Sequence, residues 1–270
     1  MMKKAFTALL LLLIGSVLNA EPIKFKGILG INFETTAVSD NWSGGEEDVL
    51  NWSVLLDAGF EKIYKKSELN TNAKIEYGKT NIEDVEKETA DQIYLDSIYS
   101  LLIKEYLAPY INFNITTQNT EFFDPVTYTE SIGGGVKVLK KEPHTLSTKL
   151  GVAFRQKFDP ADDGESSLDD PETAEIEEVL YEIGAQSITN YSFILTENSK
   201  LSSELRLFSS FEGGVNTRWE NSIYIKTGKF LTTKLGYLLI YDYDEVSRPV
   251  WPEDIQTRLN VAIGISYNLF

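Results

Sequence analysis

The chain has no cysteine and a single histidine, and after its first twenty residues it has no apolar run long enough for a membrane-spanning helix. The lack of cysteine excludes a disulfide scaffold, thiolate metal sites, thiol catalysis and a lipid-anchored N-terminal cysteine. With His144 alone, a Ser-His or histidine-metal active site is hard to build. Basic residues are also scarce. The 25 Lys and Arg against 41 Asp and Glu give a formal charge of −16, which disfavours nucleic-acid binding. We therefore expect a protein that is not an enzyme and has no metal, cofactor or nucleic-acid partner.

The first twenty residues have the pattern of an export signal. Lys3 and Lys4 precede the apolar run 6–14, and the segment ends on Ala20. A basic start, a short apolar core and a small residue before the cut are typical of a cleaved secretory signal peptide. The apolar run is too short to cross roughly 30 Å of hydrocarbon. We expect a signal peptide at 1–20 and one domain at 21–270, with a formal charge of −18 after two lysines are lost.

The rest of the chain alternates between apolar and polar residues. In 52–61, 69–78 and 146–158, apolar side chains take every second position and charged or polar ones take the others. Successive strand residues point to opposite faces, so each segment has one apolar and one polar wall. The pattern predicts twelve strands, at 24–38, 49–64, 68–79, 91–103, 106–120, 127–139, 145–158, 176–195, 201–212, 216–227, 230–243 and 255–270.

The connections between these strands alternate in length, which is typical of an outer-membrane barrel. Tight turns fall at 65–67, 104–105, 140–144, 196–200 and 228–229, and longer loops at segments such as 39–48, 80–90, 159–175 and 244–254. An amphipathic helix over 171–183 is an alternative to the start of the eighth strand. We expect the glycines at 133–135 to permit a bend or bulge in the wall.

The polar walls carry charges that cannot face lipid, because an Arg or Lys at the bilayer midplane costs roughly 2–4 kcal/mol. In a soluble sandwich the apolar faces would instead point inward. The export signal, the turn asymmetry and aromatic residues near both ends of the apolar faces favour the first arrangement. We therefore predict an all-β fold, a transmembrane antiparallel up-and-down β-barrel of about 12 strands. The candidate lumen-lining residues are Asp57, Lys74, Glu76, Lys149, Arg155, Glu182, Glu204, Arg206, Arg218, Glu220, Lys234 and Arg258.

Charge is distributed unevenly along the predicted barrel. The long loops together carry a net charge of −21, and the tight turns a small net positive charge. The loop 159–175 is the most acidic, but it lacks the ligand spacing of an EF-hand, so we expect a solvated loop rather than a cation site. The final strand ends on Phe270, which resembles the signal read by the bacterial barrel-assembly machinery. Expected partners are this machinery, outer-membrane lipid and lipopolysaccharide.

Several short motifs resemble those of a known group of proteins. They are 41–45 (NWSGG), 91–95 (DQIYL), 155–160 (RQKFDP), 218–222 (RWENS) and 229–231 (KFL). On these the chain resembles uncharacterised bacterial outer-membrane barrels, the salt-induced outer-membrane proteins and their relatives in Bacteroidetes-like bacteria. The resemblance implies a barrel fold and an outer-membrane location, and it transfers no active site.

We expect a structural barrel or a narrow pore for small polar solutes. A barrel of about twelve strands lies between filled eight-stranded and water-filled sixteen-stranded barrels, and we expect a largely occupied lumen. Two alternatives remain. A membrane-embedded hydrolase acting on lipid would need catalytic groups at the outer rim, whereas His144 falls in a tight turn. A soluble exported β-sandwich that binds a ligand is the other.

Overall fold

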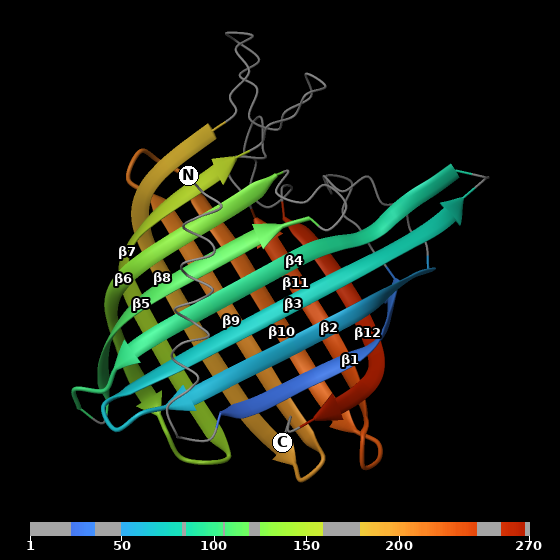
Figure 1. Cartoon of the computed structure of the whole chain (residues 1–270), viewed down its shortest axis with the longest axis horizontal. Coiled ribbons are helices and arrows are strands. Elements are labelled where there is room, and N and C mark those ends of the chain that lie inside the picture. Colours follow the sequence, from blue (N-terminus) through green and yellow to red (C-terminus); the bar gives the residue numbers. More distant parts are fainter. Residues whose placement is uncertain are drawn as a thin grey trace, which may run out of the picture.

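The computed structural model describes residues 23–35, 50–82, 85–104, 106–118, 125–158, 179–241 and 255–267. Twelve antiparallel strands form a closed barrel, in which each strand pairs with its neighbours in sequence and β12 closes on β1 (Figure 1). The strands are β1 Lys24–Thr35, β2 Leu50–Ile63, β3 Ser67–Ile82, β4 Val85–Leu101, β5 Leu107–Thr117, β6 Val126–Leu139, β7 His144–Phe158, β8 Val179–Thr196, β9 Ser199–Ser210, β10 Val215–Lys226, β11 Leu231–Tyr241 and β12 Gln256–Tyr267. The predicted fold class is confirmed, and no helix that could cross a membrane occurs in this described part.

One of the predicted long loops is wrong. β3 and β4 continue to Ile82 and from Val85, so 80–90 is mostly paired strand, and this hairpin projects beyond the other strands in Figure 1. The connection between β9 and β10 is a short turn between Ser210 and Val215, with Gly213 at φ 121° and Gly214 at φ 89°. Both connections are rich in charged or small residues, which strand extensions and turns also tolerate. The predicted signal peptide, the loop 159–175 and the terminal Phe270 lie outside the described residues.

The barrel is apolar on its outer wall and polar inside. Among the described residues, the buried ones comprise 21 polar or charged and 14 hydrophobic residues, whereas 38 large hydrophobic side chains are exposed. Leu150 and Val152 on β7 are 63% and 52% exposed, while Arg155 and Lys157 on the same strand are 8% and 4% exposed. This is the reverse of a water-soluble fold, in which burial of apolar surface supplies the main driving force. The outer wall therefore requires an apolar surrounding, which lipid provides.

Aromatic rings gather at both ends of the outer wall. At the end with the short turns, Phe25 packs against Phe60 with ring centroids 5.0 Å apart. At the opposite end, Tyr128 and Tyr181 both pack edge-on against Phe158. Amphipathic rings are enriched at the two interfaces of a bilayer, so these two groups mark the expected membrane boundaries.

His144 belongs to the aromatic group at the short-turn end. It is the first residue of β7 rather than part of the preceding turn, which corrects the expected turn boundary. Its ring stacks on Phe193 with centroids 4.3 Å apart, and its Nδ1 lies 2.9 Å from the Tyr191 hydroxyl. These contacts account for the histidine as an interfacial side chain.

The glycines at 133–135 act differently from the bulge expected for them. Gly133 pairs regularly with Gly151 of β7, and the register shift between these strands falls between Lys137 and Leu139 instead. A Cβ on Gly133 would overlap the backbone of Leu150. The glycines thus allow β6 and β7 to approach closely, without interrupting the ladder.

We expect charge on the outer wall to be costly at mid-height and cheap near the turns. Leu150→Arg should lower the free energy of unfolding in lipid vesicles by about 2–4 kcal/mol, because it places a guanidinium at the midplane. Val138→Arg, also outward but next to a turn, is the control and should cost less than about 1 kcal/mol. Urea unfolding followed by tryptophan fluorescence measures both, and equal costs would contradict the assigned membrane position.

The close approach of β6 and β7 predicts different stability costs for alanine at two adjacent glycines. Gly133→Ala should destabilise the barrel by about 1–3 kcal/mol, because the new methyl group has backbone rather than a flexible side chain in its way. Gly134→Ala should be tolerated, since nothing lies within 4 Å of its Cβ position. The temperature at which the folded form is lost on unboiled gels compares the two, and similar behaviour would argue against the close approach.

Candidate functional site

The lumen is the site that the fold builds, because alternation along twelve strands sends one set of side chains into the same enclosed space. All twelve residues predicted to line the lumen project into it. Eleven of them take part in ion pairs, and the twelfth, Lys149, lines a cavity. Four of the pairs join strands that are not neighbours in the sheet, so these contacts pass through the interior rather than along the wall.

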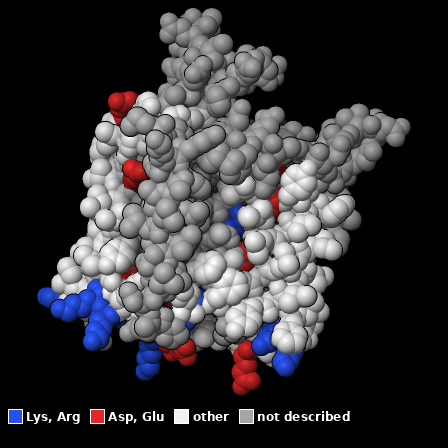
Figure 2. All heavy atoms as spheres, in the orientation of Figure 1, with Lys and Arg blue, Asp and Glu red and all other residues white. Residues whose placement is uncertain are grey.

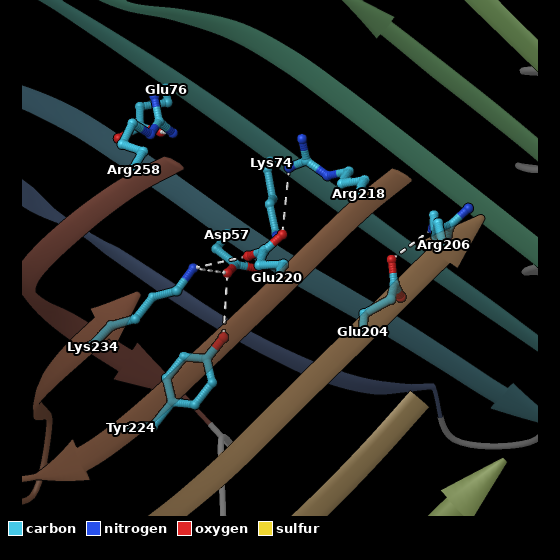
Figure 3. A network of polar contacts seen from close by, with 10 residues as sticks. All are labelled: Asp57, Lys74, Glu76, Glu204, Arg206, Arg218, Glu220, Tyr224, Lys234 and Arg258. Carbon is cyan, nitrogen blue, oxygen red and sulfur yellow. Dashed lines mark hydrogen bonds and ion pairs between the residues drawn. The ribbon is translucent and has the colours of Figure 1, made fainter. Parts of the chain in front are cut away.

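The centre of this arrangement is a cross-lumen brace, which we define as Asp57, Lys74, Glu220 and Lys234 (Figure 3). Lys74 of β3 donates to Glu220 of β10, on the opposite wall. Lys234 of β11 lies 2.9 Å from Asp57 of β2 and 3.7 Å from Glu220. Two carboxylates and two ammonium groups thus alternate in one cluster. The brace ties two separate parts of the wall together, β2–β3 and β10–β11.

Two further groups extend the brace. The Tyr224 hydroxyl lies 3.5 Å from the Asp57 carboxylate, and the Arg218 guanidinium lies 3.5 Å from Glu220. In Figure 3 both side chains point toward the brace from β10. Each carboxylate of the brace therefore has more than one donor, which is the condition for an ionised group to remain charged away from water.

A second cluster centres on Arg206 of β9. Its Nη2 lies 2.6 Å from Asp96 of β4, across the lumen, and its Nε lies 2.6 Å from Glu204 on its own strand. Asn112 of β5 donates to the other oxygen of Asp96 at 2.7 Å. Asp96 is 1% exposed, so it depends on these two donors for its solvation.

Two more pairs complete the predicted set. Arg258 of β12 lies 3.0 Å from Glu76 of β3, which also accepts a hydrogen bond from Ser53 at 2.9 Å. Arg155 and Glu182 pair at 2.9 Å between the neighbouring strands β7 and β8. The first pair crosses the lumen, and the second reinforces the wall.

Two lumen residues that sequence analysis missed hold a central place, Asp96 and Tyr94. The Tyr94 ring is 5% exposed, and the charged ends of Lys74, Arg206 and Arg218 lie 5.9, 5.9 and 5.3 Å from its centroid. Cations bind to the face of an aromatic ring, so Tyr94 links the brace to the Arg206 cluster. In β4 both faces carry apolar residues, which hides the alternation. The one available indication was the spacing of Tyr94, Asp96 and Ser100 by even numbers.

The interior divides into unequal cavities around the brace. A cavity of about 540 Å³ occupies the short-turn half of the lumen, and one of about 150 Å³ adjoins the brace. Toward the opposite end, the space between Lys74, Glu76 and Arg258 is only about 30 Å³. That volume is roughly the share of one water molecule in the liquid, so little open space lies beside the brace on this side.

Fold and lumen define a class of protein, a closed β-barrel with an apolar outer wall and a charged, cross-braced interior. Within that class, a family model described as "Protein of unknown function (DUF3078)" matches residues 33–123, about a third of the chain. No curated protein matches the chain. The resemblance to salt-induced outer-membrane proteins stays a prediction.

Among solved structures, the chain is similar to the NanC porin, with 7% identity, a TM-score of 0.46, and 89% of this chain and 98% of that one covered. The KdgM porin gives 10% identity, a TM-score of 0.40, and coverage of 90% and 99%. An outer membrane channel from Pseudomonas putida F1 gives 8% identity, a TM-score of 0.42, and coverage of 92% of this chain and 97% of that one. At this level of similarity we assign none of their activities to the chain.

The cross-lumen pair Asp96–Arg206 should be strongly coupled. Removing either partner alone, in Asp96→Asn or Arg206→Met, should cost about 3–5 kcal/mol, because, among the described residues, Arg206→Met leaves Asp96 without a cation and Asp96→Asn leaves Arg206 with Glu204 as its one carboxylate. The double variant should recover part of that loss. The exposed rim pair Lys24–Glu61, 3.9 Å apart, is the control and should show less than about 1 kcal/mol of coupling. Double-mutant cycles of urea unfolding measure both, and additive effects at Asp96 and Arg206 would contradict the pairing.

Proposed function

We propose that the chain is an integral protein of the bacterial outer membrane that forms a narrow pore for small polar solutes, constricted by the cross-lumen brace. The observation that supports this most directly is the placement of paired charges inside a wall that is apolar outside. A barrel whose only task was to stay in the membrane could fill its interior with apolar side chains. This one instead lines a polar space of several hundred Å³.

The location follows from the same wall. Lipid is the surrounding that the exposed apolar residues require, and closed barrels of this kind leave no sheet edge unpaired in it. The predicted signal peptide supports export, and the predicted acidic loops would then lie on the side of the lipopolysaccharide. Insertion by the barrel-assembly machinery is part of the proposal. The closed strand order excludes the β-sandwich alternative.

A lipid hydrolase has less support. Such an enzyme needs a nucleophile or a general base close to the membrane surface at the outer rim. His144 lies at the short-turn end, where it stacks on Phe193. In the described ranges no group of three or more metal-ligating side chains is available either.

Planar-bilayer recordings test the pore. The wild-type barrel should give small, discrete conductance steps, because the brace leaves little open cross-section. Lys74→Ala/Glu220→Ala should raise the unit conductance about two- to fivefold, since it removes two long side chains and leaves the net charge unchanged. Lys24→Ala/Glu61→Ala, a charge-neutral change at the exposed rim, should leave it unchanged.

Heat-modifiable migration on unboiled gels establishes beforehand that each variant is folded. If neither the wild type nor the Lys74/Glu220 variant conducts, the protein is a closed scaffold and the pore proposal is wrong. If the chain stays monodisperse in buffer without detergent, the membrane location is wrong as well.

A further inference from the structure

The cavity of about 540 Å³ and the adjoining cavity of about 150 Å³ form what we call the chamber, on the short-turn side of the brace. Both cavities are lined by Lys26, Gly59, Asn72, Asn190 and Glu204, so they share a boundary. The combined space has the size of a site for a small ligand. It reaches from the rim, where Lys24 is exposed, to Glu204 beside the Arg206 cluster.

The carboxylates of the chamber are all compensated by cations. Glu61 pairs with Lys24, Glu68 with Lys137 at 2.7 Å, and Glu204 with Arg206. The two brace carboxylates that border the chamber are held by Lys234 and Lys74, as described above. No chamber carboxylate is therefore left to neutralise a further cation.

Three chamber lysines have no such partner. Lys26 of β1, Lys149 of β7 and Lys200 of β9 form no ion pair or hydrogen bond within the described ranges. The charges of Lys26 and Lys200 repel each other, and Lys149 lies within the field of Glu68 and Glu204 without contacting either. Lys149 and Lys200 are half-buried, whereas Lys26 is exposed at the mouth. Charges without a counter-charge inside a barrel are unfavourable, so an anion that entered the chamber would be stabilised there.

The chamber also offers neutral donors. The side-chain amides of Asn70, Asn72 and Asn190 line it and make no hydrogen bond in the described part of the chain. Gly59 contributes by lacking a side chain, since a Cβ there would lie 2.5 Å from the Lys26 Cε. The Lys26 side chain can therefore lie over Gly59, its neighbour on β2, and extend into the chamber.

The approach to the chamber is basic as well. Figure 2 shows Lys and Arg side chains, with some Asp and Glu among them, along the lower edge, where the short turns of Figure 1 lie. Lysines occupy the turns at 65–66, 140–141 and 229. A mouth of one dominant sign raises the local concentration of counter-ions and speeds their entry.

We propose that the chamber binds a small, multiply charged oxyanion, a phosphate or a polycarboxylate, through Lys26, Lys149 and Lys200 with the asparagine amides as additional donors. The site faces the short-turn mouth, which is the periplasmic side in the proposed orientation. The inference concerns binding, so it stands whether or not the barrel conducts.

Isothermal titration of the folded barrel with inorganic phosphate tests the proposal, in a zwitterionic detergent at low ionic strength. Saturable binding is expected for the wild type. The triple variant K26Q/K149Q/K200Q should bind at least tenfold more weakly, and each single variant about threefold more weakly. The matched control K66Q/K140Q/K141Q removes the same charge from the exposed turns of the mouth, which attract anions without lining the chamber, and should lose less than about threefold in affinity. The single variants provide the answer if the triple variant does not fold.

Three results would overturn the proposal: no saturable phosphate binding by the wild type, an equal loss of affinity in both triple variants, or equal affinity for a cationic probe such as choline.

A second experiment separates a soluble ligand from a lipid headgroup. Nanodiscs of phosphatidylcholine, with and without phosphatidylglycerol, should give the same phosphate affinity, because the wall shields the chamber from lipid. Competition by the anionic lipid would show that headgroups occupy the lysines instead.

Discussion

Compensation of charge inside a narrow, lipid-surrounded barrel is the constraint on which this structure depends. The outer wall contacts lipid, so ionised side chains of the strands must occupy the inward positions. There, Asp96 at 1% exposure and Lys234 at 3% have little water, and each must find partners on other strands. Because the partners lie across the lumen, their side chains must span the distance that strand number and stagger set between opposite walls. The brace is thus an electrostatic and a geometric feature at once.

The two ends of the barrel differ in a way that matches this division. At the short-turn end the lumen is open, basic and lined by uncompensated lysines. Toward the other end, the brace and the Arg258–Glu76 pair reduce it to a space of about 30 Å³. In the proposed pore, a solute that enters from the basic side would reach the chamber lysines before the constriction. Selection of charge and restriction of size would then be separated along the axis.

Packing of the wall supports the same interior. Gly133 and Gly151 let β6 and β7 approach each other closely. A Cβ on Gly151 would also lie only 2.8 Å from the Tyr110 hydroxyl. Tyr110 is 2% exposed and packs with Ile98 and Ile188, a small apolar cluster inside the barrel. The polar lumen consequently contains a rigid apolar patch next to the chamber. This patch limits the chamber without adding charge.

The sequence by itself determined the number of strands and the outer wall, and its alternation predicted twelve charged residues to face inward. Period-two alternation decides these locally, since a strand residue's face depends only on its parity. The prediction from alternation failed in β4, because apolar residues on both faces of this strand hid the inward position of Tyr94 and Asp96. It also failed where polar composition suggested a loop, as at 80–90, although the strands continue there. Only the tertiary structure decided which charges meet, as Lys74 meets Glu220 146 residues later, because strand stagger and barrel closure set partners across the lumen. The surplus of three lysines in the chamber has the same origin, since the closed barrel places the carboxylates of its described strands out of their reach.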